Sequence, residues 1–266
     1  MVSLTFDDAL DQHLDHAIRL LDEVGLPGTF YAHISAPALT KRWQEWKRAA
    51  SSGHELGNHS IFHPADERKS WVRPGNALDN YCLDRMRQEL EVANQVLFAL
   101  DGKQQRSFAY PCSNPILGRR GWAKRALFRL GFERTRLPSW VDRCHLDFGS
   151  TQASFVPVVQ ELFLAGRGGG LTKGSTIPPV SQFARFQLPS VAIENWSLAE
   201  LIAFTEKGLK ANTWVILQFH GIGGGHRMDC GLDVFQQFTR WLAEHCATQV
   251  MTVAARAAQL WPEEPR

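Results

Sequence analysis

The chain has 266 residues, with 29 basic and 27 acidic side chains, so its formal net charge is only +2. No long run of Lys or Arg occurs, which argues against nucleic acid as a partner because such binding needs concentrated positive charge. The length suits either two ordinary domains or one α/β barrel. We expect a single domain over residues 1–266.

Strands and helices alternate along the sequence, as judged from apolar periodicity and from Gly and Pro positions. The predicted elements, in chain order, are a strand at 2–6, a helix at 10–24, a strand at 28–34, a helix at 41–51, a strand at 54–59, helices at 83–100 and 122–130 flanking a strand at 107–110, a helix at 198–210, a strand at 214–219, a helix at 232–245 and a strand at 250–253.

Two stretches interrupt this alternation. Residues 64–82 form a polar, irregular insertion, and residues 166–181 are rich in Gly and Pro and are predicted to be a long loop over the barrel. The alternation itself predicts a parallel sheet, and we expect it to form a distorted (β/α) barrel with about seven strands. Such barrels carry their chemistry at the carboxyl ends of the strands.

The cysteines and the lengths of the apolar runs bear on where in the cell the protein is found. The number of cysteines is odd, they are widely spaced, and no C-x-x-C occurs, which favours reduced thiols over disulfides or a structural zinc site. No apolar run has the length of a membrane span, and the N-terminus has no signal-peptide pattern. A cytoplasmic protein without membrane contact is therefore predicted. The cysteines are Cys82, Cys112, Cys144, Cys230 and Cys246.

Two adjacent carboxylates, Asp7 and Asp8, end the first predicted strand. Adjacent carboxylates repel one another and lose solvation at a strand end, so a nearby cation is the simplest reason to tolerate them. His59 ends the third predicted strand and His63 lies in the loop after it, at the same edge of the sheet. Two imidazoles and one carboxylate make a ligand set with open positions for water and substrate, as in hydrolytic zinc sites. The second carboxylate could then serve as a general base.

Simpler interpretations exist for each feature alone. The Asp pair could cap the helix that follows, and the two histidines could be loop residues with structural roles. Other motifs fail on inspection, because no G-x-S-x-G is present and residues 221–226 lack the last glycine of a dinucleotide fingerprint. Three tryptophans in loop-like contexts could stack on a sugar ring; these are Trp71, Trp140 and Trp196.

In combination, these motifs resemble the NodB-homology polysaccharide deacetylases, carbohydrate esterase family 4. Residues 5–8 match the family's T-F-D-D motif, and residues 59–63 match its H-[ST]-x-x-H motif. The resemblance implies a NodB-type barrel and a divalent metal held by Asp8, His59 and His63, with zinc expected and Co²⁺, Ni²⁺ or Mn²⁺ as alternatives. It further implies that Asp7 is the general base.

The resemblance extends to the later motifs, with departures. His220 resembles the general acid of the L-x-H motif, although Gln218 occupies the Leu position, and the backbone amide of Cys112 would help to bind the oxyanion. The family's arginine that holds the catalytic aspartate is replaced by Ala109. The candidates to substitute for this arginine are Arg106, Arg134 and Arg136. The nearest candidates for a carboxylate that orients His220 are Asp142 and Asp147.

The function implied is hydrolysis of a carbon–nitrogen bond other than a peptide bond, most simply N-deacetylation of an acetylated carbohydrate. An O-acetyl esterase or a small-molecule amidohydrolase of the same superfamily uses the same residues. The missing arginine and the altered L-x-H motif also permit a carbohydrate-binding relative without turnover. The oligomeric state is left open.

Overall fold

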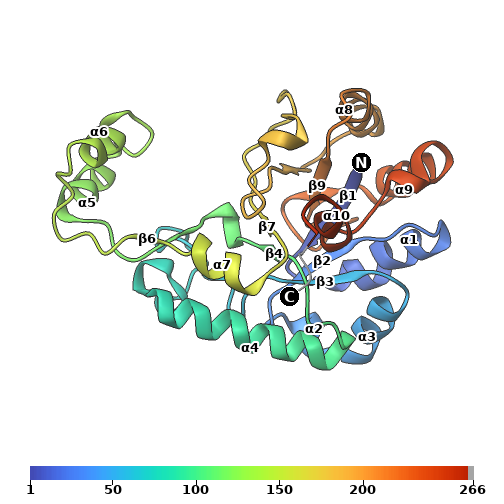
Figure 1. Ribbon diagram of the computed structural model, residues 1–266, viewed down its shortest axis with the longest axis horizontal. Coiled ribbons are helices and arrows are strands. Elements are labelled where there is room, and N and C mark those ends of the chain that lie inside the picture. Colours follow the sequence, from blue (N-terminus) through green and yellow to red (C-terminus); the bar gives the residue numbers. More distant parts are fainter. Residues whose placement is uncertain (263–266) are drawn as a thin grey trace.

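A computed structural model describes residues 1–262 (Figure 1). Its centre is a seven-stranded sheet in the order β7-β4-β3-β2-β1-β9-β8, in which every neighbouring pair is parallel. The prediction of a parallel sheet with about seven strands is confirmed. The strands are β1 (Val2–Asp7), β2 (Thr29–Ala32), β3 (Glu55–Asn58), β4 (Phe108–Ala109), β7 (Gly166–Arg167), β8 (Val191–Ala192) and β9 (Val215–Phe219).

The sheet curls, and its two edges approach one another. Arg167 of edge strand β7 forms an isolated parallel bridge with Leu188, just before β8, and Leu171 forms another with Val191 of β8. Because these bridges join the two ends of the strand order, the sheet is a distorted barrel rather than an open, flat sheet. This arrangement agrees with the predicted fold.

Helices surround the sheet (Figure 1). Helix α8 has the predicted bounds, since a capping box between Ser197 and Glu200 fixes its first turn. The predicted helix at 10–24 contains a π-helical segment, His13–Ile18, before α1. The helices around the sheet are α1 (Arg19–Glu23), α2 (Pro37–Lys41), α3 (Trp43–Ser51), α4 (Leu83–Asp101), α7 (Val156–Leu162), α8 (Leu198–Lys210), α9 (Leu232–Cys246) and α10 (Val253–Leu260).

Strand β1 lies at the centre of the core, because both of its faces are covered. Val2, Leu4 and Phe6 are fully buried. The ring of Phe6 stacks on Phe30 of β2 at 4.6 Å and on Phe219 of β9 at 5.4 Å between centroids. Such a strand is held firmly on both sides, and its carboxyl end is a rigid platform for side chains.

Two predicted elements are wrong. Residues 250–253 are not a strand: Val250 forms only an isolated bridge with Val2, and Val253 begins α10, because the Thr252 hydroxyl accepts a hydrogen bond from the Ala255 amide and caps the helix. Residues 166–181 are not entirely loop, because Gly166 and Arg167 form β7. A Cβ on Gly166 would lie 2.7 Å from the Phe186 carbonyl oxygen, so the glycine permits close packing in a strand.

An arm built from α5 (Trp122–Arg129) and α6 (Leu137–Arg143) projects from the barrel (Figure 1). Its base is the antiparallel pair β5 (Ile116–Leu117) and β6 (Ala153–Ser154). A further short pair, β10 (Gly221–Ile222) and β11 (Asp229–Cys230), follows β9. Within residues 1–262, no helix combines the length and the apolar character that a membrane span requires.

Candidate active site

The two adjacent aspartates lie at the carboxyl end of β1. Asp7 is the last residue of the strand and is 2% exposed, whereas Asp8 has a left-handed backbone with φ of +79°. Regular strand geometry would point the two carboxylates to opposite faces. The left-handed turn at Asp8 breaks this alternation, so both carboxylates reach the same cluster of histidines. Such strained residues persist where the surrounding structure holds them, and they concentrate at functional sites.

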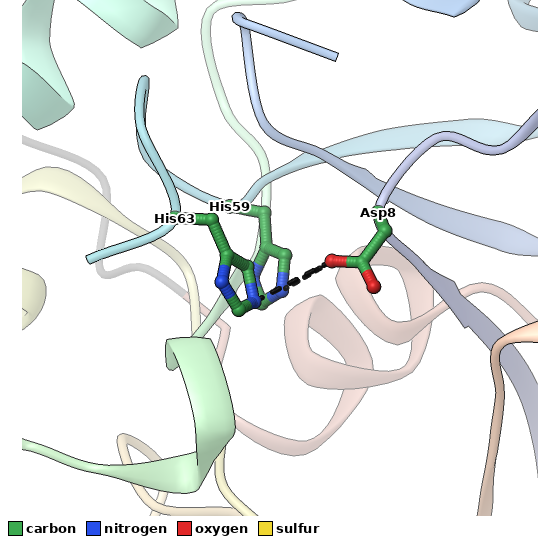
Figure 2. Close-up of side chains that lie close together, drawn as sticks. All are labelled: Asp8, His59 and His63. Carbon is green, nitrogen blue, oxygen red and sulfur yellow. Dashed lines mark ion pairs between the residues drawn. The ribbon is translucent and has the colours of Figure 1, made fainter. Parts of the chain in front are cut away.

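Asp8, His59 and His63 converge on one point (Figure 2). The Asp8 Oδ1 atom is 3.7 Å from His59 Nε2 and 3.4 Å from His63 Nε2. One ligand atom from each of the three residues lies within 4.8 Å of the others. Tetrahedral zinc bonds of about 2.0 to 2.1 Å place ligand atoms about 3.4 Å apart. The three side chains therefore fit a divalent ion.

A hydrogen bond fixes the form of His59. Its Nδ1 atom donates to the Ala109 carbonyl oxygen at 2.8 Å, so Nε2 keeps its lone pair and faces Asp8. Burial lowers the pKa of His59 to about 3, which leaves the ring neutral. Burial would raise the pKa of Asp8, but His63 and His59 outweigh it and the pKa is lowered. One carboxylate and two imidazoles are thus presented together.

Asp7 has a separate set of partners. Arg167 Nη2 donates to both of its carboxylate oxygens, at 2.7 and 2.6 Å, and Gln218 Nε2 donates to Oδ2 at 2.9 Å. Burial opposes ionisation of Asp7, but Arg167, with smaller contributions from His59 and His220, outweighs burial and lowers the pKa. Asp7 is therefore held as a carboxylate.

Arg167 and Gln218 are themselves fixed. Arg167 Nη1 donates to the Gly168 carbonyl oxygen at 3.0 Å, and its guanidinium lies over the Tyr31 ring at 5.1 Å. The Ser190 hydroxyl donates to the same Gly168 carbonyl at 2.9 Å and lies 3.3 Å from Gln218 Oε1. The orientation of the Asp7 carboxylate is thus determined by strands on both sides of it.

His220 follows β9 and faces Asp7. Its Nε2 atom is 3.8 Å from Asp7 Oδ2, and its ring stacks on His226 at 4.7 Å between centroids. Within residues 1–262, the buried Nδ1 atom has no hydrogen-bond partner. Burial lowers the pKa of His220, although Asp7 and Asp8 act in the opposite direction.

Cys112 lies in the turn that follows β4. It has a φ of +52° and Ser113 has +56°, so the turn after Pro111 is left-handed at two successive residues. The Cys112 side chain is exposed. Because this turn follows the strand that supplies Ala109, it lies at the same edge of the sheet as the histidines.

Comparison with known proteins shows what the first part of this chain is similar to. Residues 1–120 match the model of the polysaccharide deacetylase family. The match covers 120 of the 266 residues, and it shows that this part of the chain is similar to the polysaccharide deacetylases. The peptidoglycan-N-acetylmuramic acid deacetylase PdaA of Bacillus subtilis (strain 168) is 25% identical over 111 residues, which are 41% of this chain and 37% of the relative. The chain thus matches little more than a third of that relative's length.

Solved structures extend the likeness of fold to the whole barrel. A Mycobacterium smegmatis protein assigned to the polysaccharide deacetylases has a TM-score of 0.58 at 12% identity, covering 100% of this chain and 92% of that one. A family 4 acetyl xylan esterase from Clostridium thermocellum, solved with cobalt, has a TM-score of 0.52 at 17% identity, covering 97% and 90%. The fold is that of carbohydrate esterase family 4.

The prediction that Arg106, Arg134 or Arg136 replaces the arginine missing at Ala109 is wrong. Arg106 pairs with Asp101 at the end of α4, and Arg134 and Arg136 are exposed on the arm. The residue that holds Asp7 is Arg167. The sequence did not indicate it because it lies 160 positions from Asp7, at the start of a Gly-rich stretch. The apolar residues 162–165 before it were the available signal for a buried strand.

The prediction that Asp142 or Asp147 orients His220 is also wrong. Asp142 and Asp147 both lie near Lys124 in the arm, and Asp147 accepts hydrogen bonds from the Gly121 and Lys124 amides. Neither is a partner of His220 Nδ1.

His13 is a positioning residue that the sequence analysis did not identify. The Leu10 amide donates to its Nδ1 at 3.2 Å, and its Nε2 donates to the His220 carbonyl oxygen at 2.7 Å. It belongs to the π-helical segment, and such segments are frequent at functional sites. His13 therefore fixes the backbone that carries His220.

Proposed function

We propose that this chain is a metal-dependent hydrolase that removes the acetyl group from an N-acetylated carbohydrate. The observation that carries the proposal is the division of partners between the adjacent carboxylates. Asp8 faces two imidazoles, whereas Asp7 is held by Arg167 and Gln218. A metal ligand beside an ionised carboxylate of fixed orientation is the arrangement that hydrolysis of an unreactive amide requires.

The ligand set is assigned to Asp8, His59 and His63. When bound there, a divalent ion would supply Lewis acidity for the amide carbonyl and lower the pKa of water. Two imidazoles and one carboxylate suit zinc, which we propose as the ion, and the same donors accept Co²⁺, Ni²⁺ or Mn²⁺.

Each remaining residue has a defined part. Asp7 accepts the proton of the attacking water, because its salt bridge keeps it ionised. The Cys112 amide donates to the oxygen that gains charge as the carbonyl is attacked. His220 delivers a proton to the departing nitrogen. Since His220 Nε2 is 3.8 Å from Asp7 Oδ2, the proton taken by Asp7 can pass to His220 within the site.

This arrangement favours an amide over an ester as substrate. An amine is a poor leaving group unless it is protonated, whereas an alkoxide from an ester depends less on an acid. His220 beside the base therefore serves an N-acetyl group best. Arg167 also weakens the alternative of a binding protein without turnover, because it supplies the charge that is missing at Ala109.

The test is acetate release from N-acetylated and O-acetylated oligosaccharides, with the metal content of the same protein measured. We expect release from the N-acetylated series in proportion to bound zinc, and loss of both zinc and turnover in His59→Ala. Asp7→Asn should keep zinc but lose turnover. Full turnover by Asp7→Asn would overturn the assignment of the base. Release only from O-acetylated substrates would make the chain an esterase.

A further inference from the structure

The insertion at 64–82 is a closed loop with a structured neck. Ala65 and Ala77 form a parallel bridge, and the Leu78 amide donates to the Ala65 carbonyl oxygen at 2.9 Å. The Glu67 amide also donates to Asp79 Oδ2 at 3.0 Å. The two ends of the loop are therefore tied together beside His63, and the residues between them form its tip.

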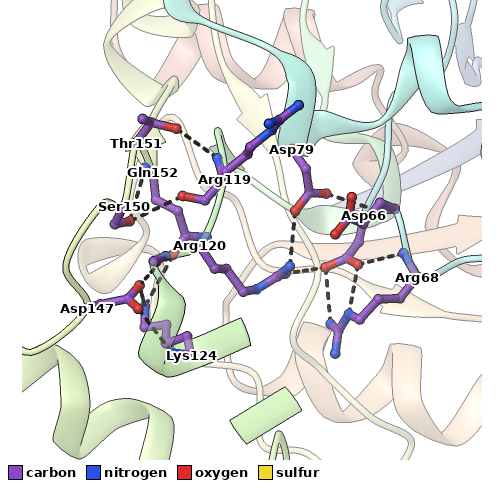
Figure 3. Close-up of polar contacts among 12 residues, drawn as sticks. Asp66, Arg68, Asp79, Arg119, Arg120, Lys124, Asp147, Ser150, Thr151 and Gln152 are labelled. Atoms are coloured by element: carbon purple, nitrogen blue, oxygen red, sulfur yellow. Dashed lines mark hydrogen bonds and ion pairs between the residues drawn. The ribbon is translucent and has the colours of Figure 1, made fainter. Parts of the chain in front are cut away.

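Ion pairs fix this neck to the base of the arm (Figure 3). Arg120 binds Asp66 from one side of the neck and Asp79 from the other, and the second contact is 3.1 Å. The side chains of these three residues are 14%, 12% and 7% exposed, so the network is screened less than a surface pair. Arg68 adds a second partner for Asp66 at 2.8 Å. The neck that carries the loop tip is thus held in place.

What the loop tip presents is an aromatic ring and a cation. Trp71 is 55% exposed, and its ring lies 5.4 Å from the ring of His63. The Lys69 ammonium lies 5.9 Å from the Trp71 ring, in a turn closed by the Val72 amide and the Lys69 carbonyl oxygen at 3.0 Å. Lys69 makes no ion pair with any of residues 1–262.

Packing of the barrel does not account for the exposed ring of Trp71 and the ammonium of Lys69 at the loop tip. An indole left half in water forgoes the free energy of burial, and the ion-pair network keeps it there rather than letting it fold inward. Its contact with His63 places it at the rim of the proposed metal site. Rigid, exposed aromatic rings beside a reactive centre are suited to stacking on a ligand, because little ordering remains to be done on binding.

We propose that Trp71 and Lys69 form a subsite for an acidic sugar. The pyranose ring lies on the indole of Trp71, and an anionic substituent of the sugar, such as a carboxylate, pairs with the Lys69 ammonium. The inference deepens the proposed function, on which it rests for the choice of a carbohydrate. It names the substrate class as an acidic glycan and assigns its recognition to this chain's own insertion.

The experiment uses two ligands that contain no acetyl group, so binding is measured without turnover. These are the tetramer of β-1,4-linked glucose and the tetramer of β-1,4-linked glucuronic acid, titrated into the zinc-loaded full chain in a low-salt buffer. We expect the acidic tetramer to bind about two- to fivefold more tightly, as one exposed ion pair allows, and this preference to shrink at high salt. Equal affinity for the two tetramers would overturn the proposal.

Variants separate the two residues. Lys69→Gln should abolish the preference for the acidic tetramer, while Lys47→Gln, at an exposed lysine on α3, should keep it. Trp71→Ala should weaken both ligands about three- to tenfold and Trp71→Phe much less, while Trp140→Ala, at a tryptophan of similar exposure on the arm, should change neither.

The outcomes that contradict the subsite differ from those that contradict the hydrolase. A preference for the acidic tetramer that survives Lys69→Gln, or wild-type affinities in Trp71→Ala, would remove the subsite and leave acetate release untouched. Binding that follows the predictions in a protein that releases no acetate from any substrate would keep the acidic-sugar site and remove the hydrolase.

Discussion

Replacing Arg167 by Met tests the central feature of the site. The variant keeps a long side chain but removes the guanidinium that contacts both oxygens of Asp7. The two side chains are 0% and 3% exposed, so water does not screen the loss. Removing one partner of a buried pair costs about 3 to 5 kcal/mol of unfolding free energy. We expect the lower end, about 3 kcal/mol, because Gln218 still donates to Asp7.

This loss is large enough to measure in two ways. In a chain of this length about 3 kcal/mol corresponds to a fall in Tm of about 6 to 12 °C. With Arg167 gone, the largest interaction that opposes burial is lost and the pKa of Asp7 rises, so less of the base is ionised at neutral pH. General-base catalysis contributes about 10² to 10⁴ in rate, and we expect kcat to fall at least about 100-fold.

Thermal unfolding and acetate release are measured together, with Arg134→Met as the control because Arg134 is exposed on the arm. The double variant Asp7→Asn/Arg167→Met should recover part of the lost stability, since no charge is left unpaired, but no activity. Wild-type kcat in Arg167→Met, or a double variant no more stable than the single one, would refute the role given to this pair.

Three further results are expected. Gln218→Leu, which restores the residue of the family motif, should lower kcat about tenfold, because a hydrogen bond to Asp7 is lost. Zinc affinity should stay constant, and a loss of about tenfold in zinc affinity would contradict this expectation. Cys112→Gly should keep full activity and gain up to about 1 kcal/mol of stability, because only the amide is used and the left-handed backbone suits glycine; loss of activity would implicate the thiol. Burial lowers the pKa of His13 to about 4, below the unfolded value of about 6.5, so the stability that the neutral ring contributes is present at neutral pH and is lost as pH falls. Because of this group, urea unfolding should show about 2 kcal/mol less stability at pH 5 than at pH 7. His13→Gln should remove that part of the pH dependence.

Local patterns in the sequence predicted most of the sheet. Strand β1 and helix α8 are marked by apolar runs and caps within their own residues, so their positions follow from short-range rules. The clustering of Asp8, His59 and His63 followed from the same rules, because parallel strands bring their carboxyl ends to one edge.

Contacts between distant, short elements could not be predicted. Strands β7 and β8 have two residues each, too few for a period to be recognised, and their pairing depends on the curl of the whole sheet. Arg167 is therefore invisible as a partner of Asp7 until the barrel is formed. Gln218 was seen as a departure from a motif, and only its contact with Asp7 gives it a role.

The proposed metal ligands all come from the first 63 residues, whereas Arg167, Gln218 and His220 come from the last 100. During synthesis, the nascent chain therefore exposes all three proposed ligands before the groups proposed to govern proton transfer have been translated. The stretch that matches the family model, residues 1–120, contains the three proposed ligands and none of these three later residues. Asp7 is made early with the proposed ligands, but the guanidinium that holds it as a carboxylate arrives only when Arg167 has been translated and β7 has joined the sheet.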